Sequence, residues 1–211
     1  MKKQKSRIFG LEYLFYDFVK LTAALPGLIA FRPKTICENE KARKKIRGGA
    51  IIIANHTGFF DPVYLLMGIW YRRQRFVCIK ELFEGKRGFF FRHFLCIPID
   101  RENFGLDKLD EITEHLKNEE LVCMFPEGRI NQEDGIASFK SGMILMSLHS
   151  GKPVIPVYIH KRAHWYERLV LVIGEPVNVC EMYGPRPTLR QIEAASKLLH
   201  EKEDELSKLK R

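Results

Sequence analysis

The stretch Ala50-Ile-Ile-Ile-Ala54 runs directly into NHTGFFDP at residues 55–62, and this junction indicates the fold. The apolar run is typical of a strand that is buried on both faces. His56 and Asp61 stand five residues apart, so their side chains would diverge on a regular helix or strand. They can meet only if the backbone turns between them, and Gly58 permits such a turn. The stretch therefore predicts a strand, a turn that holds an acid–base pair, and a helix that begins with Asp61 as its N-cap.

The composition of the whole chain is typical of one globular domain. The chain has 211 residues, of which 45% are hydrophobic and 29% charged, and this length suits a sizeable core. Its five cysteines are odd in number and form no CxxC pair, which predicts reduced thiols in a cytoplasmic protein. No pair of Cys or His residues has ligand-like spacing, so we expect no metal site.

Basic residues are concentrated near the amino terminus. The net charge is +9, and residues 1–50 hold 12 Lys/Arg against four Asp/Glu. The excess indicates an anionic partner: a membrane surface, a phosphorylated small molecule or nucleic acid. A solvated basic surface without a partner is the simplest alternative. Nucleic acid is disfavoured, because the basic residues flank an apolar aromatic segment and no recognised nucleic-acid motif occurs.

A mostly apolar segment at residues 8–31 follows a basic arm. Its charged residues Glu12, Asp17 and Lys20 would share one side of a helix, which leaves a wide apolar face. These three charges and a break at Pro26-Gly27 argue against a membrane span. We therefore expect an amphipathic membrane-binding helix or helix pair at the membrane interface. The alternatives are a helix packed on the domain core and a single span.

Strand and helix patterns alternate along the rest of the chain. Strands are expected at 50–55, 75–80, 96–100, 121–125, 154–159 and 169–173, and helices at 62–71, within 82–94, and at 106–118, 141–150 and 188–211. We therefore expect a single α/β domain at residues 34–211, with a mixed, mostly parallel sheet flanked by helices, after a membrane-associating segment at residues 1–33. Pro156 is unusual for a central strand and predicts a bulge or an edge position.

Polar clusters follow three of these strands, at the edge where open α/β sheets bind ligands. His56 with Asp61 is the first, Asp100-Arg101-Glu102 the second and Glu127-Gly128-Arg129 the third. A histidine suits a base near neutral pH, an aspartate can fix its tautomer, and arginines suit bidentate recognition of phosphate. Each cluster alone has an ordinary structural explanation, but together they form a coherent site.

The clusters carry a resemblance to a known family, the glycerolipid acyltransferases typified by 1-acyl-glycerol-3-phosphate acyltransferase. The N-H-x4-D motif of that family is met by Asn55, His56 and Asp61. Its other motifs are matched by Ile99-Asp100-Arg101, by Phe125-Pro126-Glu127-Gly128-Arg129, by Ile155-Pro156-Val157 and by the lysine-bearing segment Lys80-Glu81-Leu82-Phe83. The order of these motifs along the chain and the spacing between them agree with the family over roughly residues 30–180. Two departures concern the acceptor motifs. The usual Thr before Arg129 is missing, and Cys96 and Pro98 stand in the second motif where the usual pattern begins with Gly and varies at the penultimate apolar site.

The resemblance implies transfer of a fatty acyl group from a thioester to the free hydroxyl of a lysophospholipid. The acceptor it favours is lysophosphatidic acid, giving phosphatidic acid in phospholipid biosynthesis. In this interpretation His56 removes the proton of the hydroxyl and Asp61 holds His56. The residues expected to bind the acceptor phosphate are Lys80, Arg101 and Arg129, and those expected to shape its pocket are Glu127 and Gly128.

The same resemblance sets expectations for partners and location. The acyl donor is acyl-coenzyme A or acyl carrier protein, which is a substrate, so no cofactor is expected. The partners are then membrane lipids and the lysophospholipid acceptor, and the enzyme would be peripheral or monotopic on the cytoplasmic face of the cell membrane. Two alternatives stay open: a related acyltransferase that uses another lysolipid or an amino-lipid, and a catalytically silent membrane-binding module.

Overall fold

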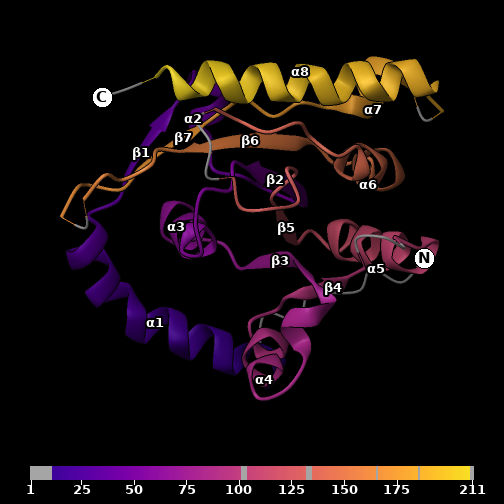
Figure 1. Ribbon diagram of the computed structural model, residues 1–211. Helices are drawn as coiled ribbons and strands as arrows, with labels where there is room; N and C mark the ends of the chain where they lie inside the picture. The colour runs from indigo at the N-terminus through magenta and orange to yellow at the C-terminus, as the bar shows by residue number, and fades with distance from the viewer. Residues whose placement is uncertain (1–10, 101–103, 132–134, 165, 185, 210–211) are drawn as a thin grey trace.

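A seven-stranded sheet lies between two layers of helices in the computed structural model (Figure 1). The structure describes residues 11–100, 104–131, 135–164, 166–184 and 186–209. The basic arm at residues 1–7 therefore lies outside the described residues. Residues of one helix layer pack on one face of the sheet and residues of the other layer on the opposite face, which gives two separate hydrophobic cores.

The sheet is mixed and mostly parallel, as the sequence predicted. Its strands, in spatial order, are β1 (Lys34–Cys37), β7 (Val170–Ile173), β6 (Val154–Ile159), β2 (Ala50–Ala54), β5 (Leu121–Met124), β3 (Gln74–Ile79) and β4 (Ile97–Ile99). Only the β6–β7 pair is antiparallel. The carboxyl ends of β2, β5, β3 and β4 therefore meet at one edge of the sheet.

The helices divide between the two faces of the sheet (Figure 1). One face carries α1 (Leu11–Phe31), α3 (Asp61–Gly68) and α4 (Arg87–His93), and the other carries α5 (Leu106–Lys117), α6 (Gly142–Ser150), α7 (Val179–Tyr183) and α8 (Leu189–Ser207). A short helix α2 (Glu40–Arg43) and a 3₁₀ turn (Lys80–Phe83) complete the described elements. The capping box of Thr188 and Gln191 fixes the start of α8.

Strand β2 is central, and every one of its residues is buried. Ile51 and Ile53 pack into the core beneath α5, α6 and α8, while Ile52 points into the core beneath α3. This alternation follows from the two-residue period of a strand, and burial on both faces explains why the run is continuously apolar.

Pro156 lies in central strand β6, so the predicted edge position or bulge is wrong. The register Val157↔Ile173 places it opposite Gly174, one residue beyond the end of β7. Its carbonyl accepts a hydrogen bond from the Gly174 N–H at 2.8 Å. Pro156 therefore lies one position beyond the last register pair of β6 and β7, where its carbonyl still accepts a hydrogen bond and its ring nitrogen donates none.

Helix α1 is continuous, so the predicted break at Pro26-Gly27 is wrong. Gly27 lies against Met67 of α3, where an added Cβ would come within 2.8 Å of the Met67 Cε atom. The glycine therefore allows close helix packing and does not end the helix. Among the described residues, α1 is the one helix that is long and apolar enough to cross a membrane, over Tyr13–Phe31.

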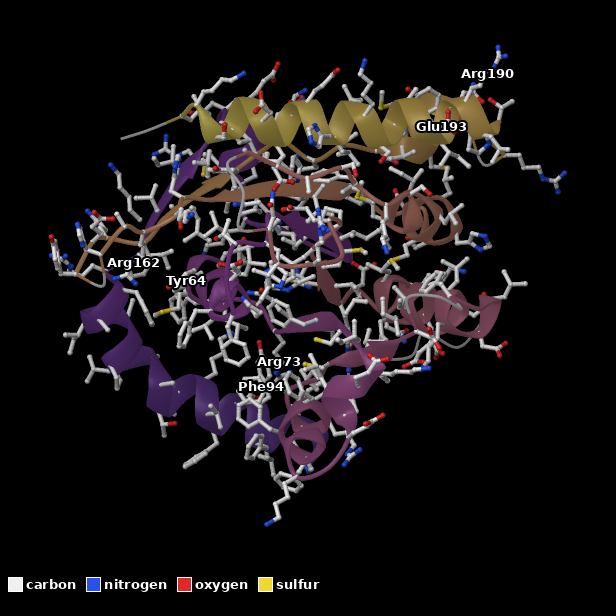
Figure 2. The ribbon with its side chains drawn as sticks, in the orientation of Figure 1. Tyr64, Arg73, Phe94, Arg162, Arg190 and Glu193 are labelled. Carbon is white, nitrogen blue, oxygen red and sulfur yellow. The ribbon has the colours of Figure 1, made fainter. Side chains whose placement is uncertain are left out.

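The polar side of α1 faces the domain. Asp17 forms an ion pair with Arg73 at 2.6 Å, which lowers the pKa of the Asp17 carboxyl. Lys20 donates to the Arg72 carbonyl at 2.9 Å. Figure 2 places Arg73 and Phe94 near the end of α1 that meets α4. Asp17 and Lys20, two of the charged residues that the sequence assigned to one side of the helix, are thus used for docking.

The opposite side of α1 is apolar and exposed. Its members fall within an arc of about 100° at roughly 100° per residue. They are Leu14, Phe18, Leu21, Leu25, Leu28 and Ile29. We call this set the outer face of α1.

Replacing Tyr16 with phenylalanine should weaken the docking of α1. The Tyr16 side chain is fully buried, and its hydroxyl accepts the backbone N–H of Gln74 at the start of β3, at 3.1 Å. Tyr16→Phe leaves that buried N–H without this acceptor, which should lower the free energy of unfolding by about 1–3 kcal/mol in urea denaturation. Tyr183→Phe is the matched control, because the Tyr183 hydroxyl has no hydrogen bond to any described residue. Equal losses in the two variants would contradict this account of docking.

Candidate active site

The predicted site residues follow four neighbouring parallel strands at one edge of the sheet. His56 follows β2, Glu127 follows β5, Lys80 follows β3 and Asp100 follows β4. Neighbouring strands lie about 4.8 Å apart, so groups at the ends of adjacent strands can contact one small ligand. The open carboxyl edge of a parallel sheet is also where such folds bind ligands.

His56 and Asp61 are in direct contact. The Nδ1 atom of His56 lies 2.9 Å from Oδ2 of Asp61, whose side chain is 2% exposed. An ionised carboxylate only accepts hydrogen bonds, so Nδ1 carries the proton of the neutral imidazole. The lone pair is then on Nε2, for which the described residues offer no hydrogen-bond partner. His56 is thus oriented as a base with one free nitrogen.

The turn between the two residues is fixed by the Asp61 carboxylate. Oδ2 of Asp61 also accepts the backbone N–H groups of Thr57 at 2.6 Å and Gly58 at 2.8 Å. The chain turns at this point, as the sequence predicted, but the turn does not require a glycine at position 58. Gly58 does not have a positive φ, and a Cβ at this position would meet no atom within 4 Å.

The prediction that Asp61 is the N-cap of the following helix is also wrong. The N-cap is Phe60, α3 begins at Asp61 itself, and no side chain caps the helix. The Asp61 carboxylate is turned back toward the loop, where it binds two N–H groups and the imidazole. A pattern of Asp before Pro does not distinguish these two uses, because both place an acceptor at the start of a helix.

The aromatic ring of Phe125 stacks on the imidazole of His56. The ring centroids are 4.1 Å apart and the planes are inclined by 17°. Phe125 directly follows β5, so the neighbouring strand sets the plane of the catalytic candidate. This contact restricts rotation of the ring around the Asp61 hydrogen bond.

Glu127 holds the backbone of His56. Its side chain is buried, Oε1 accepts the His56 N–H at 2.9 Å and Oε2 accepts the Ala137 N–H at 3.1 Å. On the other side, the His56 carbonyl accepts the Asn131 N–H at 2.6 Å. The sequence assigned Glu127 to the acceptor pocket, whereas its contacts in the structure are those of a residue that supports the His56 loop.

Gly128 and Arg129 form a tight turn after Glu127. Gly128 has φ +71°, which favours glycine, and a Cβ there would lie 3.2 Å from Cε of Lys140. The Lys140 stem thus crosses over Gly128, while the Lys140 N–H is bonded to the Pro126 carbonyl at 3.0 Å. Arg129 and Lys140 are exposed, and neither side chain forms a hydrogen bond or ion pair with any described residue.

Sequence reasoning missed Lys140. It stands 11 positions after Arg129, in a polar loop without periodicity, so no local pattern marks it. Only the close approach of its stem to Gly128 reveals that it belongs to the same site.

Lys80 is engaged by Asp100. Its Nζ lies 2.5 Å from Oδ2 of Asp100, and both side chains are partly exposed. Lys80 would have to share or leave this ion pair to bind a phosphate. Arg101, the other cation predicted at this edge, lies outside the described residues. In the part of the chain that the structure describes, no cluster of three or more His, Cys, Asp or Glu residues could hold a metal ion.

Comparison with known proteins identifies related sequences. Residues 34–160 match the profile of a family described as Acyltransferase. The 1-acyl-sn-glycerol-3-phosphate acyltransferase of Bacillus subtilis is 27% identical over 164 residues, which cover 75% of this chain and 81% of that protein. The enzyme of the same name from Streptococcus pneumoniae is 27% identical over 139 residues, which cover 63% of this chain and 51% of that protein.

A solved structure has the same fold. The crystal structure of the 1-acyl-sn-glycerophosphate acyltransferase of Thermotoga maritima superposes with a TM-score of 0.64 at 20% identity. The superposition covers 94% of this chain and 82% of that one. The mixed sheet flanked by helices is therefore shared between the two chains.

Replacing Glu127 with glutamine should destabilise the His56 loop. An amide has one acceptor oxygen and one NH₂ group, so either the His56 N–H or the Ala137 N–H would face a donor. We expect the free energy of unfolding to fall by about 1–3 kcal/mol. Glu114→Gln on the exposed side of α5 is the control and should change stability by less than about 0.5 kcal/mol. A Glu127→Gln protein as stable as the wild type would show that the carboxylate is not needed there.

Proposed function

The chain belongs to the Acyltransferase family, and from that premise we propose that it transfers a fatty acyl group from a thioester to the free hydroxyl of lysophosphatidic acid. The product is phosphatidic acid. The observation that carries the proposal is the Nε2 of His56, which has no partner among the described residues and is held by Asp61 at the same sheet edge as two cations, Arg129 and Lys140, that pair with no described residue. The names of the relatives from Bacillus subtilis and Streptococcus pneumoniae support the same acceptor.

His56 acts as the general base in this reaction. A protonated hydroxyl is a poor nucleophile, so Nε2 takes its proton as the oxygen attacks the thioester carbonyl. The carbon–sulfur bond then breaks, and the thiolate leaves with the proton that His56 releases. Asp61 stabilises the imidazolium between these two steps. Transfer is direct, so no acyl group is attached to the enzyme.

The acceptor phosphate binds at Arg129 and Lys140. These residues follow β5 and lie one strand away from the end of β2. A spacing of about 4.8 Å is comparable to the separation of a hydroxyl and a phosphate on adjacent carbons of glycerol. Guanidinium groups grip phosphate through paired hydrogen bonds, and an ammonium adds a point charge. Lys80 at the end of β3, and Arg101, which comes two positions after β4 in the sequence, are the further candidates.

The acyl donor is acyl-coenzyme A or acyl carrier protein, bound as a substrate. Its thioester must reach the open edge of the sheet at His56, where the side chain of His56 is partly exposed. The donor and the lysophospholipid acceptor both carry an apolar fatty acyl chain. A membrane beside this edge would supply the acceptor directly.

The outer face of α1 binds the membrane in this proposal, with the enzyme peripheral or monotopic on the cytoplasmic face. Exposed aromatic rings extend the apolar surface at both ends of the helix. Phe15 contacts Phe89 of α4, with the ring centroids 6.2 Å apart. Near the other end, Tyr64 contacts both Phe31 and the exposed Phe60, which lies in the His56 loop. Figure 2 shows Tyr64 between the last turns of α1 and the sheet.

The central test is acyl transfer by purified protein, with several lysolipids paired with both donor types and the products identified by mass spectrometry. Wild type should convert lysophosphatidic acid to phosphatidic acid. His56→Ala should lose roughly 10²–10⁴-fold in turnover, the range of general-base catalysis. Asp61→Asn should also lose turnover, since the amide no longer stabilises the imidazolium. Normal turnover in a folded His56→Ala protein would end the proposal, and a strong preference for another acceptor would correct the substrate.

The phosphate site is tested by comparing lysophosphatidic acid with neutral monoacylglycerol. Wild type should strongly prefer the phosphorylated acceptor. The double variant Arg129→Ala/Lys140→Ala should lose most of that preference, with the apparent KM for lysophosphatidic acid raised more than that for the thioester. Lys117→Ala, an exposed lysine on α5, is the control. An unchanged preference in the double variant would place the phosphate elsewhere, with Arg101 and Lys80 next to be replaced.

Membrane binding is tested by changing the outer face without disturbing the docked side. Leu21→Ser/Leu25→Ser should move the protein from liposomes to the soluble fraction in flotation, because two exposed apolar side chains are removed. Leu106→Ser/Leu189→Ser changes two equally exposed leucines on α5 and at the start of α8 and should leave flotation intact. Equal flotation of both double variants would show that α1 is not the anchor.

A further inference from the structure

The turn after β2 carries two exposed aromatic side chains that take no part in the chemistry described above. Phe59 and Phe60 lie between Gly58 and Asp61, and they are 75% and 54% exposed. The turn does not require these rings, because it is closed by the Asp61 carboxylate on the backbone N–H groups of Thr57 and Gly58. Adjacent exposed apolar side chains beside a catalytic candidate indicate a binding surface.

A row of aromatic rings continues from this turn to the end of α1. The ring centroids of Phe59 and Phe60 are 5.7 Å apart, and Phe60 stacks on Tyr64, one helical turn further along α3, at 6.5 Å. Tyr64 in turn contacts Phe31, the last residue of α1, at 5.3 Å. Figure 2 shows Tyr64 beside this end of α1, together with Arg162. We call Phe59, Phe60, Tyr64 and Phe31 the ring row.

The ring row and the cations of the site lie on opposite sides of His56 along the sheet edge. The row ends at Phe31, whose carbonyl accepts the N–H of Leu169 just before β7, two strands away from β2. Arg129 follows β5, the strand on the other side of β2, and the stem of Lys140 crosses the same turn. From one side to the other, the edge therefore presents aromatic rings, the imidazole and then positive charges.

The segment after β6 also carries cations, but they do not change this order. The Arg162 guanidinium lies over the ring of Phe31 at 5.3 Å, at the far end of the ring row. Lys161 is exposed on the same side. A phosphate bound at Lys161 would turn the acyl chain of an acceptor toward Arg129 and Lys140, where hydrocarbon would cover charged groups at a cost in solvation free energy.

The acceptor has the same order of groups as the sheet edge. In the 1-acyl form of lysophosphatidic acid, the free hydroxyl lies on the glycerol carbon between the acyl ester and the phosphate. We propose that the ring row binds the acyl chain of the acceptor, while its hydroxyl lies at Nε2 of His56 and its phosphate at Arg129 and Lys140. The inference rests on the proposed acyl transfer and adds a third point of contact to it. Phe59 and Phe60 are then specificity-determining residues for the acceptor.

Holding the acyl chain is a different task from holding the enzyme on a membrane. Full burial of one methylene group is worth about fourfold in affinity, and contact on one side is worth about twofold. A soluble, monomeric acceptor reaches the site without a membrane. The dependence of its turnover on chain length therefore reports on the ring row and not on the outer face of α1.

The test uses two soluble lysophosphatidic acids whose acyl chains differ by several methylene groups, with saturating thioester and no vesicles. Wild type should gain about twofold in kcat/KM for each added methylene. Phe59→Ala/Phe60→Ala should keep the wild-type kcat and lose most of this gain, because the apolar surface nearest to His56 in the chain is removed. Phe59→Leu/Phe60→Leu keeps an apolar surface and should restore most of the gain. The KM for the thioester should be unchanged in both double variants.

Two further variants serve as controls. Trp70→Ala removes an aromatic residue that is 69% exposed just beyond the other end of α3, and it should follow wild type with both acceptors. Lys161→Ala should keep the preference for lysophosphatidic acid over monoacylglycerol. Loss of that preference in Lys161→Ala would place the phosphate on the side of the ring row and overturn the proposal.

An unchanged chain-length gain in Phe59→Ala/Phe60→Ala would also overturn it. So would an equal fall in kcat with both acceptors, which would show that the rings only support the His56 loop. Loss of the chain-length dependence of the thioester, with that of the acceptor intact, would assign the ring row to the donor instead. If wild type does not acylate lysophosphatidic acid, the proposed function fails before any variant is compared.

Discussion

The Asp61 carboxylate is the interaction on which the rest of the site depends. Its Oδ2 atom accepts hydrogen bonds from the Thr57 N–H, the Gly58 N–H and Nδ1 of the His56 imidazole. The same three contacts close the turn after β2, orient the histidine and provide the negative charge that an imidazolium requires. Because one carboxylate oxygen makes all three contacts, the turn and the acid–base pair depend on the same group.

The loop that Asp61 closes is also held from the neighbouring strands. Glu127 and Asn131, from the segment after β5, bind the N–H and the carbonyl of His56, and Asn55 ties the end of β2 to β6. Each contact uses a backbone group that the end of a central strand would otherwise leave unsatisfied in a buried position. The central place of β2 in a parallel sheet therefore accounts for the rigid placement of His56, because both flanking strands contribute to it.

Much of the fold could be predicted from the sequence, because buried parallel strands are continuous apolar runs. The expected strand at 154–159 agrees with β6 in full, and β2 and β5 agree within one residue at their ends. Strand β1 was not predicted, since Lys34–Cys37 is a short edge strand with a mixed composition and is defined only by its pairing with β7. The membrane-associating boundary at residue 33 and the catalytic roles remain predictions.

The features that the sequence could not give are those that depend on tertiary contacts. The spacing of Asp17 and Lys20 predicts a polar side of α1. Only their contacts with Arg73 and with the Arg72 carbonyl show that this side faces the domain. Lys140 likewise belongs to the site through the close approach of its stem to Gly128, which no local pattern encodes. The outward apolar face of α1 follows from the docking of its polar side, so the proposed membrane contact and the fold have a common cause.

The most direct measurement is a crystal structure of the enzyme with lysophosphatidic acid bound in the absence of thioester. The account predicts that the acceptor hydroxyl oxygen lies roughly 2.6–3.2 Å from Nε2 of His56, with Nδ1 still bonded to Asp61. The phosphate should contact Arg129 and Lys140 at the end of β5. A hydroxyl held away from Nε2, with the lipid bound at another part of the sheet edge, would contradict the assignment of His56 as the base.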